Sequence, residues 1–382
     1  MRKTWKRLST FGVLTAATMS LVACSGEVKE EITGKDILKV GMVTDAGTID
    51  DKSFNQGTWE GIKRYESEHE EIRAQYVQPK DASTQAFLEA IDNLVLAGNQ
   101  VVVTPGFSFE EAIGQAQQTY PQVKFVLIDG QPLVGQDDEG QGVYEIKENT
   151  VSISFSEHEA GFLVGVASAL ESETGKLAYL GGVPVPAVQK LGWGFVAGVA
   201  YANQVLGTNA QMVDYIYQGT FTETEAGRTI AGGLYDKGVD VIFAAAGAVG
   251  VGAISEAKTR TESGESVYIV GVDVDQYEEG LITDGRSVIL TSAMKRIDQA
   301  AYEMVAKAVA GEFPGGEVIA MDASLNGVGL PTENPNLSSE TMKTVQEVFG
   351  RIQSGEIQVP NSAETLEAYL AEQDAVFEGL VY

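Results

Sequence analysis

The stretch "ILKVGMVTDAGTIDDKSFNQGTWEG" (residues 37–61) decides the fold. Its first seven residues form a short apolar run typical of a buried strand. From Ser53 the pattern predicts a helix through residue 69, with Ser53 as its N-cap. A glycine-containing loop with three aspartates separates the two elements. A strand, a polar loop and a helix in succession predict one βα unit of a parallel sheet.

The same alternation of short apolar runs and longer helical patterns continues along the chain. A first series runs to the strand "KFVLIDG" (residues 124–130), and a second series begins at "TVSISF" (residues 150–155). Strands that alternate with helices form parallel sheets covered by helices on both faces. The sequence therefore predicts an α/β protein with two lobes of like architecture.

The N-terminus indicates export and a lipid anchor. Four basic residues precede the apolar run "FGVLTAATMSLVA", which is too short for a stable membrane span and reads as a signal peptide, residues 1–23. The run ends in "LVAC", which resembles the bacterial lipobox, so we expect cleavage before Cys24 and lipid on it. Cys24 is the only cysteine of the chain, which excludes an internal disulfide. Residues 24–36 are polar and read as a tether; a free thiol that stands here by chance is the alternative.

Composition narrows the classes of partner. The 382 residues carry a formal net charge of −28, and removal of the basic signal would make the chain more acidic still. Such a chain repels the phosphates of nucleic acids. The length suggests about two domains. We see no second apolar stretch of transmembrane length, so the acyl chain on Cys24 is the expected membrane attachment.

Polar residues and glycines end most of the predicted strands. In open parallel sheets, ligands bind outside the carboxyl ends of the strands, so two facing lobes would bring these residues to one cleft. They are Asp45, Gly106, Asp129, Gly181, Gly182, Gly247, Asp273 and Lys295.

Two pairs of residues suggest a flat, hydroxyl-bearing ligand. Phe54 can stack on a ring and Asn55 offers both a donor and an acceptor to a heterocycle. A core residue of the first helix is the alternative for Phe54, and composition alone favours it. Asp273 can accept hydrogen bonds from neighbouring hydroxyls while Lys295 donates to the same oxygens. A structural ion pair at the strand ends is the alternative for this second pair.

Metal and catalytic sites fit the sequence less well. The loop "VTDAGTIDD" resembles the D-T-D-P-G-x-D-D calcium motif of nucleoside hydrolases, but Val43 replaces the first aspartate, the proline is missing and one residue is inserted. The turn "AAAGAVGVG" (residues 244–252) contains neither G-x-G-x-x-G nor a P-loop lysine. We therefore expect no metal, no cofactor and no enzymatic activity.

Several spaced motifs together resemble one family. The whole mature chain is similar to the basic membrane protein (BMP) family of bacterial lipoproteins in "VTDAGTIDDKSFNQGTWEG", "KFVLIDG", "FSEHEAGFLVGVAS", "GGVPVPAVQKLGWGFVAGV", "DVIFAAAGAVGVGAISEA", "VGVDVDQ" and "LTSAMK". The resemblance implies a type I periplasmic-binding-protein fold of two Rossmann-like lobes joined by a hinge. On this fold we assign residues 37–148 and 276–322 to one lobe, and residues 149–275 and 323–382 to the other.

The resemblance also implies a function. Characterised members bind nucleosides, purine ones above all, and feed them to an ABC importer. This chain would then be a lipid-anchored, monomeric receptor on the extracytoplasmic face of the cell membrane, with a nucleoside ligand and an ABC permease as partners.

Carried over by residue, the resemblance implies specific ligand contacts. Phe54 would stack on the base and Asn55 would bond its edge, while Asp45 and Asp129 would line the same lobe. Asp273 and Lys295 would hold the ribose. Phe243 is the candidate for the opposing aromatic ring, and Gly247 lies in "GAVG", which departs from the expected "GGTG".

Three alternatives stay open at this point. The protein could bind a sugar or another small polar ligand instead of a nucleoside. It could be a nucleoside-cleaving enzyme, which would release free base from inosine. It could also be a cell-surface adhesin or immune-interaction protein, which predicts no internal cleft.

Overall fold

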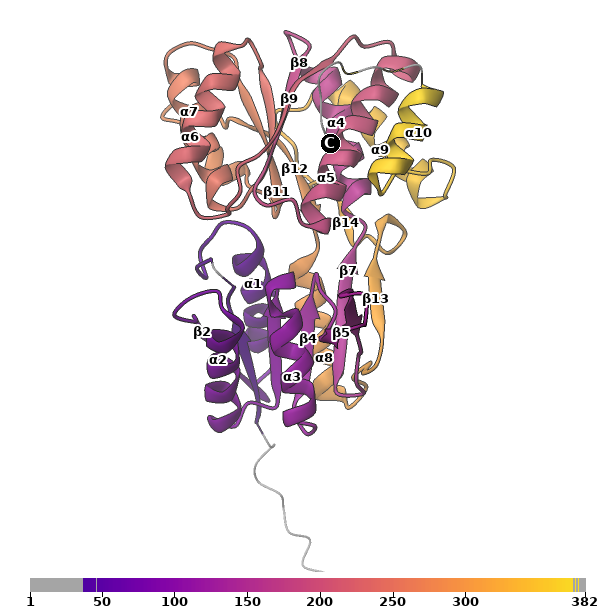
Figure 1. Cartoon of the computed structure of the whole chain (residues 1–382). Coiled ribbons are helices and arrows are strands. Elements are labelled where there is room, and N and C mark those ends of the chain that lie inside the picture. Colours follow the sequence, from indigo (N-terminus) through magenta and orange to yellow (C-terminus); the bar gives the residue numbers. More distant parts are fainter. Residues whose placement is uncertain (1–36, 46, 374, 376, 378–382) are drawn as a thin grey trace, which may run out of the picture. The chain divides into compact units, whose positions relative to one another are not determined.

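The computed structural model of the chain describes residues 37–45, 47–373, 375 and 377 (Figure 1). The predicted signal peptide, Cys24 and the tether lie outside these residues. The described part of the chain contains two six-stranded sheets and one small hairpin. We call the first sheet and the helices that pack on it lobe 1, and the second sheet and its helices lobe 2.

Lobe 1 has a fully parallel sheet in the order β13-β7-β4-β3-β1-β2. Helices α2 and α3 pack against one face with a core around Phe87, and α1 and α8 pack together over the other. The strands are β1 (Leu38–Val43), β2 (Ile72–Val77), β3 (Val101–Pro105), β4 (Lys124–Ile128), β7 (Thr150–Phe155) and β13 (Val318–Met321). The helices are α1 (Phe54–Glu68), α2 (Thr84–Leu96), α3 (Glu110–Thr119) and α8 (Ile297–Ala310).

Lobe 2 repeats this plan in the order β14-β12-β11-β10-β8-β9, parallel except for β14. Helices α6 and α7 cover one face and α4 and α5 the other, with α9 against α4 and α10 against α5. The strands are β8 (Lys176–Gly181), β9 (Gln211–Tyr217), β10 (Val241–Ala245), β11 (Tyr268–Asp273), β12 (Ile289–Lys295) and β14 (Val328–Gly329). The helices are α4 (Glu157–Glu171), α5 (Pro186–Tyr201), α6 (Thr224–Asp236), α7 (Ala248–Glu262), α9 (Ser339–Gln353) and α10 (Ala363–Glu372).

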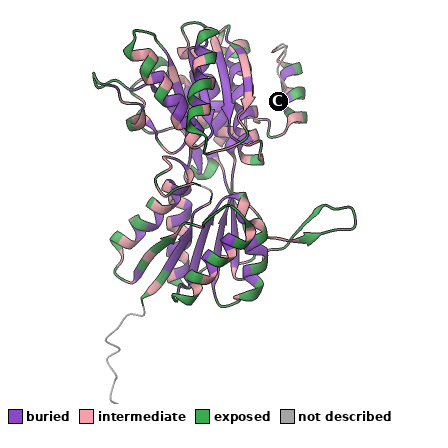
Figure 2. Ribbon diagram, turned by 60° about the vertical axis from the view of Figure 1, so that its left-hand side comes forward, coloured by how far each residue is buried: buried purple, intermediate pink, exposed green. Residues whose placement is uncertain are grey.

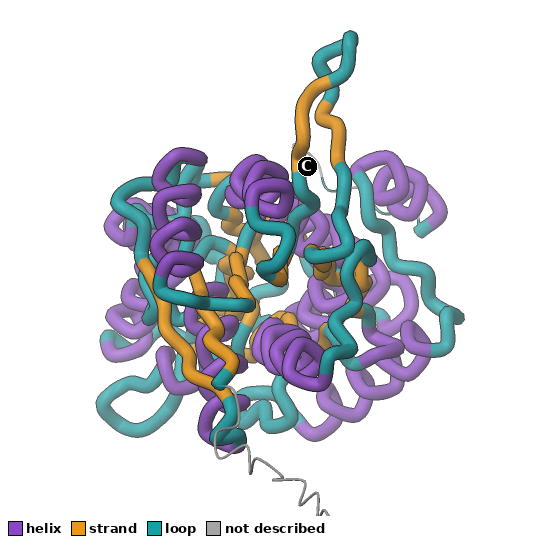
Figure 3. The backbone as a smooth tube through the Cα atoms, turned by 90° about the horizontal axis from the view of Figure 1, so that it is seen from below, coloured by secondary structure: helices purple, strands orange, loops and turns teal. Residues whose placement is uncertain are grey.

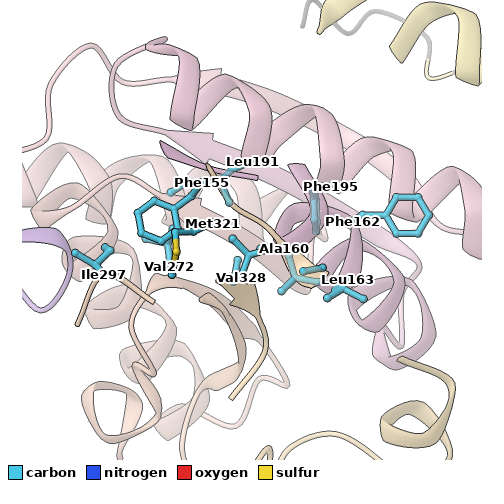
Figure 4. Close-up of a cluster of buried hydrophobic side chains, with 14 of the residues drawn as sticks. Phe155, Ala160, Phe162, Leu163, Leu191, Phe195, Val272, Ile297, Met321 and Val328 are labelled. Carbon is cyan, nitrogen blue, oxygen red and sulfur yellow. The ribbon is translucent and has the colours of Figure 1, made fainter. Parts of the chain in front are cut away.

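The chain passes between the lobes three times, after β7, after β12 and after β13. Side chains beside these passages, among them Phe155, Ile297 and Met321, are buried in a single hydrophobic cluster with residues of lobe 2 such as Val272 (Figure 4). The passages are therefore packed segments rather than loose linkers, as a hinge that must keep its geometry requires.

The prediction of two parallel sheets with covering helices is confirmed. Two strands, however, belong to the other lobe than their predicted assignment. Residues 150–155 were assigned to the second lobe, but β7 pairs with β4 and β13 in lobe 1. Residues 289–295 were assigned to the first, but β12 pairs with β11 and β14 in lobe 2. Strand periodicity indicates a buried strand but not its hydrogen-bonding neighbours, which lie far away in the sequence.

A hairpin that the sequence did not predict lies between β4 and β7. Strands β5 (Leu133–Gln136) and β6 (Gly142–Tyr144) pair antiparallel and extend away from the lobe 1 sheet (Figures 2 and 3). The base of the hairpin is held on α3, because the carbonyl of Leu133 lies against Gly114, where a side chain would collide with it.

Within the described residues, no helix has both the length and the apolar character of a membrane span.

Helices α4 and α5 approach each other with their backbones in contact. A Cβ atom at Gly198 would overlap the carbonyl oxygen of Phe162, and one at Gly165 would overlap that of Phe195. Glycine at these positions lets two helices of lobe 2 pack closer than side chains would allow. The contact matters for function, since α4 begins directly at the passage that follows β7.

Gly198→Ala should therefore destabilise the protein by about 1–3 kcal/mol, because the added methyl group must push the two helices apart. Gly350→Ala is the matched control: Gly350 lies in α9 with open space around it. There alanine should stabilise the helix by about 0.5–1 kcal/mol. Thermal unfolding of both variants checks this, and an unchanged Tm for Gly198→Ala would contradict the described helix contact.

Candidate functional site

The acidic loop after β1 is organised by Asp51. Its Oδ1 accepts from the main-chain N–H groups of Ser53 (3.0 Å) and Gln56 (3.1 Å), and its Oδ2 accepts from the N–H of Asn55 (2.9 Å). Asp51 thus caps α1, where a negative charge is favourable. Ser53 is the N-cap residue of α1, as predicted, but its side chain makes no capping hydrogen bond: its hydroxyl instead donates to Oδ2 of Asp273 in lobe 2, at 2.5 Å.

Asn55 is buried and its amide group is used within the loop. Its Nδ2 donates to Asp45 Oδ1 (2.7 Å) and Asp51 Oδ2 (2.8 Å), and its Oδ1 accepts from the N–H of Asp45 (3.1 Å). Both amide hydrogens are therefore engaged, which leaves Asn55 little to offer the edge of a base. In this arrangement Asn55 fixes Asp45, whose pKa is raised by burial although Asn55 and Gly47 donate to the carboxylate.

Lys295 lies at the centre of the predicted strand-end residues. It ends β12, its side chain is 3 % exposed, and its ammonium contacts Asp129 at the end of β4. Two further carboxylates lie near the same ammonium, Glu157 at 3.6 Å and Asp273 at 4.0 Å. The cluster thus joins residues from the carboxyl ends of strands in both lobes, as the sequence predicted for Asp129, Asp273 and Lys295.

Burial and charge together set the ionisation of this cluster. Burial alone would lower the pKa of Lys295, but Asp129, Glu157 and Asp273 raise it above its ordinary value, so the ammonium stays charged. Burial raises the pKa of Asp129 to about 6, against the opposite influence of Lys295. Burial also raises the pKa of Asp273, while Lys295 and Ser53 favour its charged form.

The Phe54 ring lies beside this polar cluster and is only partly buried. The Lys295 ammonium is 4.9 Å from the ring centroid, within the range of a cation–π interaction. On lobe 1, a Cβ atom built on Gly106 would lie 3.7 Å from the Phe54 ring and 3.6 Å from Asp45 Oδ2. Asp45, Phe54 and Gly106 are thus neighbours, and the strand ends predicted this for Asp45 and Gly106.

Phe243 is a core residue of lobe 2. This residue lies in the middle of β10, is 0 % exposed, and packs on Tyr179 (ring centroids 5.4 Å apart) and Phe195 (5.3 Å). The interpretation of Phe243 as an opposing aromatic ring is therefore wrong in this geometry. Its side chain points to the α5 face of the sheet, a direction that the apolar run "VDVIF" does not reveal.

Phe221 is the aromatic residue that the sequence analysis missed. It follows β9 and is partly exposed. A Cβ atom built on Gly182 would overlap the Phe221 ring, and a Cβ atom built on Gly247 would lie 3.4 Å from the Cβ of Phe221. Gly182 and Gly247 follow β8 and β10, so all three residues lie at the edge of the sheet that carries Asp273. The strand-end rule could have found Phe221, because "QGTF" directly follows the strand that ends at Tyr217.

Glu157 is a second residue that the sequence analysis missed, and it too lies just after the end of a strand. It begins α4 two residues after β7, is buried, and lies 3.4 Å from the ammonium of Lys190 and 3.6 Å from that of Lys295. The neighbouring His158 is partly buried, and this burial lowers the pKa of its imidazole to about 4, so it is neutral at pH 7. Glu157 therefore adds a third carboxylate to the Lys295 cluster.

The cluster has one acceptor with unused capacity. Oδ1 of Asp129 is buried and has no hydrogen-bond partner in the described part of the chain. Buried polar atoms of folded proteins are nearly always paired, so this oxygen suits a ligand that brings a donor. Among the described residues no group of three or more His, Cys, Asp or Glu is arranged to hold a metal ion.

Comparisons with known proteins identify the family of the chain. Residues 38–363 match the family model Bmp, described as "ABC transporter substrate-binding protein PnrA-like". The chain is 32% identical to the CD4+ T-cell-stimulating antigen of Listeria innocua, over 91% of this chain and 96% of that one. It is 29% identical to the "ABC transporter nucleoside-binding protein BmpA" of Lactococcus lactis, over 93% and 99% of the two chains.

The fold is also found among solved structures. An ABC transporter solute-binding protein from Aeropyrum pernix superposes with a TM-score of 0.73 at 24% identity, over 88% of this chain and 97% of that one. This confirms the predicted type I periplasmic-binding-protein fold. With the family match over most of its length, the chain belongs to the Bmp family of ABC transporter substrate-binding proteins.

Proposed function

We propose that this protein captures nucleosides, purine nucleosides above all, and delivers them to an ABC permease. The Lys295 cluster is the observation that carries the proposal: a buried ammonium faces carboxylates of both lobes beside a partly exposed aromatic ring. A nucleoside combines a flat ring with hydroxyl and amino donors, which these groups complement. The name of the Lactococcus lactis relative supports the same ligand class.

In this proposal the base and the ribose contact different residues. The base stacks between Phe54 and Phe221, which come from different lobes, and its donors face Asp45 and Asp129. The two ring partners favour the large flat surface of a purine. The ribose hydroxyls donate to Asp273 and accept from Lys295. Asn55 contributes indirectly, because it holds Asp45 in place.

The charge of the cluster favours uncharged ligands. Three carboxylates, Asp129, Glu157 and Asp273, face the two ammonium groups of Lys295 and Lys190. A ligand with donor groups adds hydrogen bonds there without adding negative charge, whereas a phosphate would be repelled. A free sugar also offers hydroxyl donors, so sugar binding is the alternative, and it would not require Phe221.

Location and mode of action follow from the family and the N-terminal sequence. We propose that Cys24 carries the lipid, so that the protein works as a monomer on the extracytoplasmic face of the membrane. The lobes would close on the ligand and the permease would receive it from the closed form. We propose that the protein does not cleave its ligand, since its relatives are described as binding proteins of transporters.

Phe221→Ala should weaken the binding of adenosine and guanosine alike by about 1–3 kcal/mol, a Kd about 5- to 150-fold higher, because stacking accepts any flat ring. Phe243→Leu is the control. It removes part of a buried core ring and should lower the Tm but leave the affinity of the folded protein unchanged. Calorimetric titration and thermal unfolding separate the two effects. Loss of binding in Phe243→Leu, with Phe221→Ala unaffected, would reverse the assignment.

Nucleoside affinity should fall as the pH is lowered through about 6, the pKa of Asp129. The charged carboxylate accepts from a ligand donor more strongly than the protonated carboxyl group does, so affinity is full above this pH and falls by at most about tenfold per pH unit below it. The charged groups around Asp129 are Lys295, Glu157, Lys190 and Asp273. Asp129→Asn should bind more weakly at pH 7.5 but with a flatter pH profile. An unchanged profile in this variant would contradict the assignment.

Unfolding at acidic pH does not explain such a loss at Asp129. The folded-state pKa of this group is raised from its ordinary value of 3.8 to about 6, so between these two pH values the folded protein binds more protons than the unfolded chain. The contribution of Asp129 to the free energy of unfolding therefore increases as the pH falls through this window. Measuring the Tm at each pH checks that the protein is folded throughout the titration.

A further inference from the structure

Among the described residues, two polar contacts between the lobes lie outside the Lys295 cluster: a partly exposed ion pair between Lys52 and Glu279 (3.2 Å) and a hydrogen bond of Gln276. The Nε2 of Gln276 in lobe 2 donates to the main-chain carbonyl of Lys52 in lobe 1, at 2.7 Å. The other close polar contacts described above, Ser53 with Asp273 and Lys295 with Asp129, involve proposed ligand-binding groups. The Gln276 bond differs because its acceptor is backbone and neither residue belongs to the Lys295 cluster.

Gln276 is fixed within lobe 2 by its other polar groups. Its Oε1 accepts from the N–H of Val272 (3.1 Å), and its own N–H donates to Ser292 Oγ (3.1 Å). The side chain is folded back over Gly271, where a Cβ atom would lie 2.6 Å from Oε1. Because Val272 requires an acceptor, the amide orientation is determined, and the NH₂ group must point towards lobe 1.

The acceptor is equally well placed on lobe 1. Lys52 has a positive φ of 58°, which is uncommon for a residue with a side chain, and it lies between the capping residue Asp51 and Ser53. The carbonyl of Lys52 therefore belongs to the loop that leads into α1 and holds Asp45 and Phe54. Close by, Gly57 of α1 packs against Val274, since a Cβ atom there would lie 3.0 Å from Val274 Cγ1.

We infer that Gln276 is a closure residue: it stabilises the closed lobes over a bound nucleoside without contacting the nucleoside. This inference rests on the proposed function. One neutral hydrogen bond made only in the closed form should slow opening and hence ligand release, and it should act on every ligand alike. Loss of it should raise the Kd by about two- to tenfold.

Gln276→Glu tests this role with an almost isosteric change. The carboxylate still accepts from Val272 but can no longer donate to the Lys52 carbonyl. Gln353→Glu is the matched control, because Gln353 donates to the Ala323 carbonyl (2.9 Å) within lobe 2. Stopped-flow measurements with guanosine and adenosine should give a larger dissociation rate constant for Gln276→Glu and an unchanged association rate constant. Equilibrium titrations should give an unchanged ratio of the guanosine Kd to the adenosine Kd. The effect should persist at high salt, which screens the added charge.

Two results would overturn the inference. A changed ratio of the guanosine Kd to the adenosine Kd would mean that Gln276 contacts the ligand. Equal release rates for Gln276→Glu and Gln353→Glu would mean that the Gln276–Lys52 bond does not hold the lobes together. If the unmodified protein binds no nucleoside, the proposed function fails, but the closure role is still measurable. Small-angle scattering of the ligand-free proteins should then give a larger radius of gyration for Gln276→Glu than for Gln353→Glu, and equal radii would refute it.

Discussion

The ion pair between Lys295 and Asp129 is the interaction on which the rest of the site depends. It joins the last residue of β12 in lobe 2 to the residue that follows β4 in lobe 1, and both side chains are nearly inaccessible to solvent. A buried ammonium is tolerated only when carboxylates surround it. Glu157 and Asp273 are the two further carboxylates near the Lys295 ammonium. The same pairing brings the ends of the two parallel sheets to one place.

The backbone of the fold explains why these residues meet. In a parallel sheet all carboxyl ends lie at one edge, and the three passages of the chain between the lobes keep the two edges together. Asp51 and Asn55 then order the loop that carries Asp45, while Gly182 and Gly247 leave room for Phe221 on the opposite sheet. In the proposed site, charge selection and ring stacking would thus be separate properties of neighbouring strand ends.

Much of this could be read from the sequence, and the failures have physical causes. The alternation of strands and helices predicted the fold, and the strand-end rule predicted that Asp45, Asp129, Asp273 and Lys295 would meet. The direction of side chains could not be predicted from the sequence. Phe243 and Phe221 are both aromatic residues near strand ends, and only their burial in the folded protein distinguishes the core ring from the accessible one.

Long-range hydrogen bonds were equally hidden. Serine is a common N-cap residue and Ser53 stands at the start of α1, but its hydroxyl donates a hydrogen bond to Asp273, 220 residues away in the sequence. The pairing of β7 and β12 was misassigned because a strand's own pattern carries no information about its neighbours. Proposals that depend on such contacts, the closure role of Gln276 above all, could come only from the structure.

The central claim is that the Lys295 cluster and its two partly exposed rings bind a nucleoside. Calorimetric titration of the protein, first unfolded and refolded to remove any co-purified ligand, tests this most directly with guanosine, adenosine, free ribose and myo-inositol. We expect saturable one-to-one binding of the nucleosides and much weaker binding of ribose and myo-inositol. Binding of a free sugar with no heat from either nucleoside would contradict the claim.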